Sequence, residues 1–572
     1  MKFNYKLFGL VMFVMLICCV SAASATDVDN ITVPDDTGII EIDDTVDSVD
    51  DVEIGEDDDS VDDTSDGATD VLNDDSKVST TQTRDIVTPS NLRKYFNLNT
   101  GYTITNKDLT FNGSFSAKTF GNFKISQSIN INASSATFTN IGFDILSPNT
   151  NLTGGTFTAN TGANNGATIK VAASNVTIDG AKITITTPTT SDYFAINVLN
   201  ANYAKLLNNA ITYTVQTATT NYNHVIRVVS SENVTVYKNN ITAYLPLKDV
   251  DFTQTFPSIY TDQVAGVAIQ SSKGFNFTGN KLDIVGNARL DEDYPTLDAL
   301  IIVQSVNSYI VGNTINLKDI VSQEDDTNYL YAIDVYQCDN LTIDSNVITI
   351  NSDGGNLTVN GTGAAYGIQL TGSHVGIIIS NNNITTANNG PNLGIYSQNY
   401  YGGTSLTIYD NKICVTGKAG NHPWALVAGM ELQDDYALVY NNTICVNNTA
   451  GYDSANCAYG ISYSQSTSGS HYYDIENNTV CLYNGDYTVY LDSPATGVIQ
   501  GNNLTAIGTI TKTGNTTIYA PNITPGPNPW NIHYKWIFHH CDEHVIEKHY
   551  FITDICINII LINQFDFCSW FN

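Results

Sequence analysis

One short phrase recurs along most of the chain and constrains its fold more than any other feature. Successive copies read YKNNITAY, IVGNTINL, IDSNVITI, IYDNKICV and VYNNTICV, each with an Asn two residues before an aliphatic residue. The copies lie about 24 to 41 residues apart, the length of one supersecondary unit with variable loops. The anchor asparagines are Asn209, Asn239, Asn280, Asn313, Asn346, Asn382, Asn411, Asn442, Asn478 and Asn502.

Apolar and polar residues alternate within each copy, as in Leu341–Asp344 followed by Val347–Ile350. This period of two is typical of strands with one buried face. A further run, such as Ala332–Tyr336, precedes each phrase, so each unit has about three short strands. Helical periodicity is absent from residues 101 to 517. The strands must therefore connect by turns and stack on the next unit, which predicts an all-β, single-stranded parallel β-helix.

The anchor Asn is interpreted as a fold determinant and not as a catalytic amide. A sharp bend between two strands needs a residue with positive φ, which Asn tolerates better than other residues with a side chain. Stacked coils would also let these amides hydrogen-bond as a ladder. We therefore predict that each anchor Asn occupies the left-handed position of its bend.

The first 25 residues have the pattern of a secretory signal. Lys2 and Lys6 precede an apolar run, Leu7–Val20, and the small residues Ser21–Ala25 follow it. The run is short for a membrane span. We expect cleavage before Thr26, a secreted protein and no membrane span after cleavage.

An acidic segment, residues 26–86, follows the signal. From Thr26 to Ser76 it contains about 21 Asp and Glu and no Lys or Arg, which predicts a disordered spacer. It is interpreted as a solubilising spacer, with weak cation binding as the alternative. The net charge of −33 argues against nucleic acid and anionic membranes as partners.

A capping segment, residues 87–100, precedes the predicted β-helix of residues 101–518. Ser90 could cap a short helix with Leu92, Tyr95 and Phe96 on one face, and such a helix would cover the open end of the stack.

The C-terminal part of the chain departs from the repeat. A Pro-rich linker, residues 519–529, leads to an atypical tail, residues 530–572, with five of the nine His and three of the four Trp. The tail also contains three of the ten Cys. Its His and Cys residues could hold zinc, but their spacing matches no known motif. An out-of-frame or foreign tail is the favoured interpretation.

Three inter-coil loops carry acidic clusters at equivalent places. Stacking would bring them to one side of the rod, where carboxylate oxygens could bind calcium. The alternative is solvated charge on loops. The candidate metal ligands are Asp249, Asp251, Asp291, Glu292, Asp293, Glu324, Asp325 and Asp326.

Glutamines recur on one strand of many coils, where a matching position would form a ladder on the surface. They are interpreted as structural amide stacking, with a glycan-binding strip as the alternative, and tyrosines nearby could pack on sugars. The glutamines are Gln270, Gln304, Gln337, Gln369, Gln398, Gln433 and Gln465.

Three cysteines, Cys414, Cys445 and Cys481, share one repeat position and should point outward. Neighbouring coils bring Cα atoms near disulfide distance, so one cross-coil bridge could form, but free thiols in place of Thr are the favoured interpretation. Dense N-x-S/T sequons permit glycosylation of an exported chain. The dipeptide Asp434-Asp435 resembles a paired-carboxylate motif, but no suitably placed His or Arg is evident from the sequence.

The repeat resembles the right-handed parallel β-helix repeats of pectate-lyase-like proteins. The layout of signal, acidic spacer, TPSNLRKYFN cap and Asn/Thr-rich coils resembles the adhesin-like surface proteins of methanogenic archaea. The resemblance implies a secreted cell-surface protein that binds glycans or neighbouring cell surfaces without catalysis, and it assigns no catalytic residue. The alternatives are a polysaccharide lyase or hydrolase on the same fold, using the acidic loop residues, and a structural envelope protein.

Overall fold

The computed structural model describes residues 84–507, apart from residues 161–165, 188–192, 216–223, 250–263, 290–294, 321–327, 353–363, 400–402, 420–425, 451–456, 464–470 and 492–494, together with 518–519 and 523–524. The chain divides into two units, residues 1–77 and 78–572, and every described residue belongs to the second. The predicted signal, nearly all of the acidic spacer, most of the linker and the tail lie outside the described residues.

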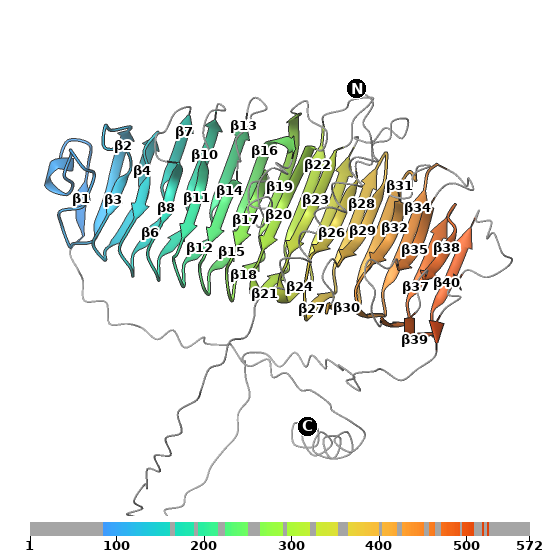
Figure 1. Ribbon diagram of the computed structural model, residues 1–572. Helices are drawn as coiled ribbons and strands as arrows, with labels where there is room; N and C mark the ends of the chain where they lie inside the picture. Colours follow the sequence, from blue (N-terminus) through green and yellow to red (C-terminus); the bar gives the residue numbers. More distant parts are fainter. Residues whose placement is uncertain are drawn as a thin grey trace, which may run out of the picture. The chain divides into compact units, whose positions relative to one another are not determined.

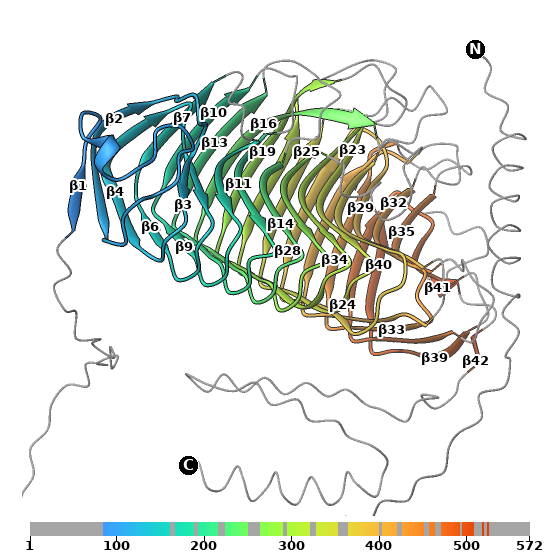
Figure 2. The same cartoon turned by 60° about the vertical axis from the view of Figure 1, so that its left-hand side comes forward.

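The second unit is a right-handed parallel β-helix, as the repeat predicts (Figure 1). Each strand pairs in parallel with its equivalent in the next coil, as Lys182–Thr187 does with Ala210–Val215. The strands fall into three rows along the axis. Rows 2 and 3 meet at a sharp bend within one continuous sheet, and row 1 forms the other sheet (Figure 2).

From β8 to β40, each coil contributes one strand to each row. Row 1 consists of β3 (Phe123–Ile125), β5 (Phe143–Ile145), β8 (Ala167–Val171), β11 (Phe194–Leu199), β14 (His224–Val229), β17 (Ala265–Gln270), β20 (Pro295–Val303), β23 (Tyr329–Tyr336), β26 (Ala365–Thr371), β29 (Asn392–Gln398), β32 (Leu426–Leu432), β35 (Cys457–Tyr463), β38 (Tyr487–Leu491) and β41 (Ile518–Tyr519). Row 2 consists of β6 (Asn151–Thr153), β9 (Thr177–Asp179), β12 (Lys205–Leu207), β15 (Thr235–Tyr237), β18 (Asn276–Thr278), β21 (Val306–Val311), β24 (Asp339–Asp344), β27 (Ile377–Ser380), β30 (Ser405–Tyr409), β33 (Tyr436–Tyr440), β36 (Tyr472–Glu476), β39 (Ala495–Gln500) and β42 (Ile523–Thr524). Row 3 consists of β7 (Thr156–Asn160), β10 (Lys182–Thr187), β13 (Ala210–Val215), β16 (Asn240–Asp249), β19 (Lys281–Arg289), β22 (Thr314–Asp319), β25 (Val347–Ser352), β28 (Asn383–Asn388), β31 (Lys412–Gly417), β34 (Thr443–Asn448), β37 (Thr479–Tyr483) and β40 (Asn503–Ile507).

The first coils are closed by β1 (Asp85–Val87), β2 (Leu109–Ser116) and β4 (Asn130–Thr139), which pair in that order. The predicted capping helix is wrong: the segment forms a single 3-10 turn, η1 (Leu92–Lys94), without a side-chain cap. Leu92, Tyr95 and Phe96 are nevertheless buried against the first coils. Pro89 fixes the backbone just ahead of this turn, and three turn residues suffice to place the apolar side chains over the open end.

The anchor asparagines form one continuous hydrogen-bonded ladder at the bend between rows 2 and 3. The backbone N–H and the Nδ2–H of each donate to Oδ1 of the next, at 2.8–3.1 Å. Nδ2 also donates to a carbonyl of the preceding coil, as Asn280 does to Val236 O at 2.8 Å. Every member from Asn209 to Asn478 is buried. The ladder therefore satisfies the polar backbone that the bend would otherwise leave unpaired.

The predicted backbone conformation of the anchor Asn is wrong by one residue. The left-handed residue is the one just before each anchor Asn, for example Lys238 with φ 54° and Ser345 with φ 56°. The bend needs an inward amide and a positive φ, and no single residue supplies both. The preceding residue turns the chain, and the Asn side chain points into the corner.

We predict that the ladder contributes strongly to stability. Asn239→Ala would leave the donors of Asn209 without their acceptor and should lower the free energy of unfolding by about 2–5 kcal/mol. The adjacent Asn240 is exposed on β16, so Asn240→Ala should change the free energy by less than about 0.5 kcal/mol. Urea unfolding followed by circular dichroism measures both, and equal losses would contradict the role of the ladder.

Candidate functional site

The outward side of row 1 carries several buried acids and amides. Ile333 and Val335 of β23 point into the core, so Asp334 between them points outward. The strand register aligns such positions into columns. We call the outward residues of β20 to β38 the row-1 face: Asp298, Tyr331, Asp334, Tyr366, Gln369, Tyr396, Glu431, Tyr459, Tyr487 and Tyr490.

Two fully buried acids, Asp298 and Asp334, lie on this face in neighbouring coils. Asp298 is 0% exposed and Asp334 is 1% exposed. Both carboxyl oxygens of Asp298 and Oδ1 of Asp334 have no hydrogen-bond partner. The register pairs Asp298 with Tyr331 and Asp334 with Ile301, so the two acids occupy adjacent columns.

Burial makes the charged form of both acids unfavourable. It raises the pKa of Asp298 well above its ordinary value, and the charge of Asp334 raises it further. Burial also raises the pKa of Asp334, to about 7, although hydrogen bonds from Val335 and from the Gln369 side chain oppose the shift. The pair therefore retains a proton at neutral pH, and Asp334 can exchange a proton near pH 7.

Tyrosine rings stack along the same face. The rings of Tyr331 and Tyr366 are nearly parallel with centroids 5.0 Å apart, and the ring of Tyr396 lies 5.4 Å from that of Tyr366 and is tilted by 50°. Farther along the axis, Tyr459 and Tyr490 stack at 4.8 Å. Such rings combine an apolar face with a hydroxyl. The arrangement places aromatic platforms beside acids and amides over successive coils.

A second buried cluster lies where row 1 turns into row 2. His374 Nε2 lies 2.6 Å from Asp434 Oδ1, and Ser397 Oγ lies 3.3 Å from the same Nε2 and also donates to Asp434. The neighbouring Asp435 lies 3.4 Å from Nδ1 of His471. The sequence alone gives no sign of a His next to Asp434-Asp435, because His374 lies 60 residues earlier in the chain, two coils away.

The hydrogen bonds of this Ser–His–Asp cluster join three coils and have a structural role. They do not prepare Ser397 as a nucleophile with His374 as its base. Ser397, His374 and Asp434 are all at most 1% exposed. Ser397 hydrogen-bonds the carboxylate directly, so it is not held for attack on an external group. His374 Nδ1 faces the Gly372 carbonyl at 2.9 Å and Nε2 faces the carboxylate, so both ring nitrogens face acceptors, which favours the charged form of the ring.

The predicted glutamine strip does not form one ladder, and this part of the interpretation is wrong. Gln270 is in register with Val303, and Gln398 with Thr371. Gln304 and Gln337 lie one residue later, at positive-φ turns, where Gln304 Nε2 donates to Gln337 Oε1 at 3.1 Å. The remaining members differ again: Gln369 lies in the Asp334 column, Gln433 follows β32, and Gln465 lies outside the described residues. A shift of one residue moves a side chain to another column, and the spacing of the glutamines along the sequence does not reveal such a shift.

The predicted calcium ligands fall almost entirely outside the described residues. These are Asp251, Asp291, Glu292, Asp293, Glu324, Asp325 and Asp326. Only Asp249 is placed, at the end of β16, where it pairs antiparallel with Pro295. Among the described residues, no group of three or more His, Cys, Asp or Glu could hold a metal ion.

The three cysteines are stacked in register on β31, β34 and β37, as the repeat predicts. Cys414 pairs with Cys445, and Cys445 with Cys481. All three are partly exposed free thiols in the structure. Burial, and then the neighbouring thiols, raise the pKa of Cys445. A cross-coil disulfide remains a prediction.

No helix in the described part of the chain is long and apolar enough to cross a membrane.

No protein-family model matches the chain, and no curated protein sequence matches it. Several solved structures resemble it in general fold. A mutant of a periplasmic alginate epimerase is 11% identical, over 77% of this chain and 84% of that chain, with a TM-score of 0.35. A PL6 alginate lyase in complex with a trisaccharide is 14% identical, over 77% and 95%, with a TM-score of 0.33. DFA-IIIase from Arthrobacter chlorophenolicus A6 without its lid is 11% identical, over 68% and 82%, with a TM-score of 0.32. These likenesses transfer no activity, and the fold follows from the strand pairing.

We predict a pH dependence from His374. Burial lowers the pKa of His374, but the Asp434 carboxylate and the Gly372 carbonyl outweigh burial and raise it above 6.5. The stabilisation by this pair is then fully present below pH 6.5 and is lost as pH rises through the raised pKa. His374→Gln should destabilise the protein by about 3–5 kcal/mol at low pH and by less at high pH.

Urea unfolding between pH 5.5 and pH 9 measures this effect. His224→Gln, at a buried histidine of β14, is the matched control and should keep the pH dependence of the wild type above pH 6.5. A wild type whose stability does not fall above pH 6.5 would contradict a charged His374.

Proposed function

We propose that this protein is a secreted, cell-surface carbohydrate-binding protein of adhesin type, which binds glycans through the row-1 face. The stacked tyrosines beside buried acids and amides are the observation that supports it. The exposed parts of these rings can contact the apolar side of a sugar, and the tyrosine hydroxyls can bond its hydroxyl groups.

The β-helix makes this face suitable for a polymer. Coils repeat at about 4.8 Å along the axis, so a glycan lying along the rod meets a ring or a polar group at each step. Tyr331, Tyr366 and Tyr396 come from three successive coils, β23, β26 and β29. Many weak contacts of this kind add up when a long ligand engages them together.

Export supports the same proposal. The N-terminal pattern is that of a secretory signal, and the acidic segment that follows would help to keep the exported chain soluble. The dense sequons are compatible with glycosylation of an exposed chain.

We predict that Tyr366 is needed for glycan binding. Tyr366→Ala removes the central ring of the platform and should weaken binding at least tenfold, equivalent to about 1.4 kcal/mol. Tyr309→Ala is the matched control, since Tyr309 is exposed at 43% on row 2 and its loss should leave affinity unchanged. Retention of the full chain on arrays of plant, mucin and microbial glycans identifies the ligand, and titration of that ligand measures both variants.

A second candidate function is cleavage of a polysaccharide on the same face. The Asp298–Asp334 pair favours it, because an acid with a pKa of about 7 can donate or accept a proton at neutral pH. We assign the binding function first because, among the described residues, no Arg, Lys or His shares this part of the row-1 face with the two acids. In the Asp298 column His224 lies two coils earlier, and in the Asp334 column Arg227 lies three coils earlier.

Released sugar separates the two functions. We expect glycans to be retained without the appearance of new reducing ends or unsaturated products between pH 4 and pH 9. If product appears, and if Asp334→Asn lowers its rate at least a hundredfold while Asp344→Asn at the end of the row-2 strand β24 does not, cleavage would replace binding as the function.

A further inference from the structure

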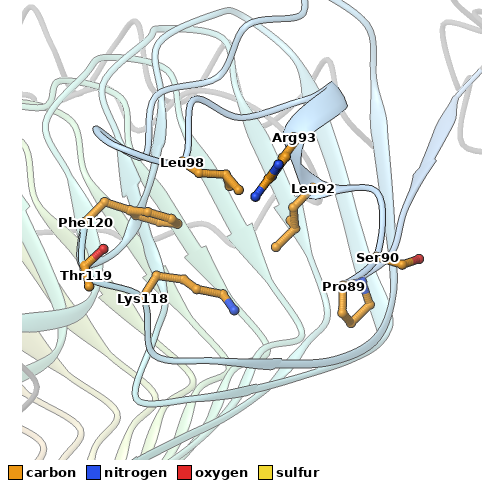
Figure 3. A pocket seen from close by; sticks show the side chains of 8 residues that line it. All are labelled: Pro89, Ser90, Leu92, Arg93, Leu98, Lys118, Thr119 and Phe120. Atoms are coloured by element: carbon orange, nitrogen blue, oxygen red, sulfur yellow. The ribbon is translucent and has the colours of Figure 1, made fainter.

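A pocket opens at the N-terminal end of the β-helix, away from the row-1 face. Its volume is about 380 Å³. Two segments line it: residues 89–98, which contain η1, and the connection between β2 and β3 (Figure 3). The lining residues are Pro89, Ser90, Leu92, Arg93, Leu98, Lys118, Thr119 and Phe120.

The pocket combines an apolar wall with two positive charges. Leu92 is buried, and Leu98 and Phe120 pack partly against the core, so these three side chains form a fixed surface. Arg93 and Lys118 extend from different segments toward the same space (Figure 3). Neither forms an ion pair with any described residue. Two cations without counter-ions therefore converge on a hydrophobic surface.

The local charge around the pocket is opposite to that of the chain. The whole protein has a net charge of −33, yet residues 84–124 contain six Lys and Arg against two Asp, Asp85 and Asp108. Asp85 pairs with Lys107 at 3.7 Å, and Asp108 accepts hydrogen bonds from Asn130. Neither acid faces the pocket cations.

Other cations of this end are already engaged. Lys94 lies over the ring of Tyr95 and Lys124 lies over the ring of Tyr102, each at 5.1 Å. Arg93 and Lys118 are thus the positive groups directed at the pocket. An anion that the acidic remainder of the molecule repels would be attracted here.

We propose that this pocket binds a sugar that carries one anionic group, as in an acidic glycan. Arg93 and Lys118 would hold the carboxylate or sulfate, since the guanidinium can bond two of its oxygens. The ring of Phe120 would pack on the sugar face, and the hydroxyl of Thr119 can bond one of its hydroxyl groups. The volume is that of a small-ligand site and the pocket presents one ring, which fits a single sugar residue better than a peptide.

The inference does not rest on the row-1 proposal. The two sites share no residue, and the ligand chemistry differs: the row-1 face carries acids, which would repel an anionic sugar, whereas this pocket carries cations. One molecule would therefore hold an acidic glycan at its end and another glycan along its side.

Titration of the full chain with fluorescent oligo-galacturonate tests the site. We expect saturable binding that weakens as salt increases and falls at least tenfold in Arg93→Gln and in Lys118→Gln. Lys107→Gln is the matched control, because it removes one charge from the same end but from a residue paired with Asp85. Its affinity should stay within twofold of the wild type.

Three further ligands distinguish the chemistry. A sulfated oligosaccharide that binds with the same dependence on Arg93 and Lys118 supports an anionic-sugar site and identifies sulfate as the group. The carboxyl-reduced, neutral oligosaccharide should not bind to this site, and equal binding of it would overturn the proposal. Poly-glutamate that binds more tightly than both anionic sugars would overturn the sugar assignment.

Folding and the other site are checked separately. Circular dichroism should show the wild-type spectrum for each Gln variant, since both side chains are exposed. Unchanged galacturonate affinity in both variants would overturn the site. Tyr366→Ala should retain galacturonate binding, so a failure of this inference and a failure of the row-1 proposal give different results.

Discussion

The structure depends on the in-register stacking of each coil on the next. Aliphatic side chains fill the interior, and the Asn ladder supplies the hydrogen bonds of the bend between rows 2 and 3. Each ladder Oδ1 accepts two donors from its neighbour, so the loss of one amide would leave polar groups unpaired in two coils. With the interior and this bend fixed, loops can lengthen and outward side chains can vary without changing the fold.

Stacking also explains how the candidate sites arise. An outward position in one coil aligns with the same position in the next, so a function is spread over a column of residues far apart in sequence. The column of Asp334 begins at Lys124, Asp144 and Lys170 and continues to Glu431 and Tyr490. The same geometric position carries a cation, an acid or a ring in different coils.

In the fold, an apolar residue could take the place of either buried acid of the row-1 face. Ala265 pairs with Asp298 in one column, and Ile301 pairs with Asp334 in the other. A buried carboxyl oxygen without a hydrogen bond lowers stability, and Asp298 has two such oxygens and Asp334 one. Such a cost to stability is compatible with the glycan-binding role proposed for the row-1 face.

Sequence reasoning reached the fold and the ladder because both depend on local periodicity. It erred where one residue decides the outcome: Ser345 and not Asn346 takes the positive φ, and a one-residue offset separates Gln304 from the column of Gln270. The acids were missed for a different reason. Asp298 and Asp334 each interrupt an apolar run, LDALIIV and AIDVY, in consecutive coils, and that signal was available, whereas the pairing of His374 with Asp434 across two coils requires the three-dimensional register.

The two proposed sites differ in how they depend on the array. The row-1 face is built from repeated coils, so its affinity for a polymer should grow with the number of coils engaged. The N-terminal pocket is built from the cap, which occurs once, and its affinity depends on two fixed cations and one ring. A rod of this kind can change its lateral specificity by replacing outward residues coil by coil, while the pocket can change only with the cap that closes the core. The row-1 face is therefore the more variable recognition surface. The end pocket can vary only together with the residues that close the end of the core.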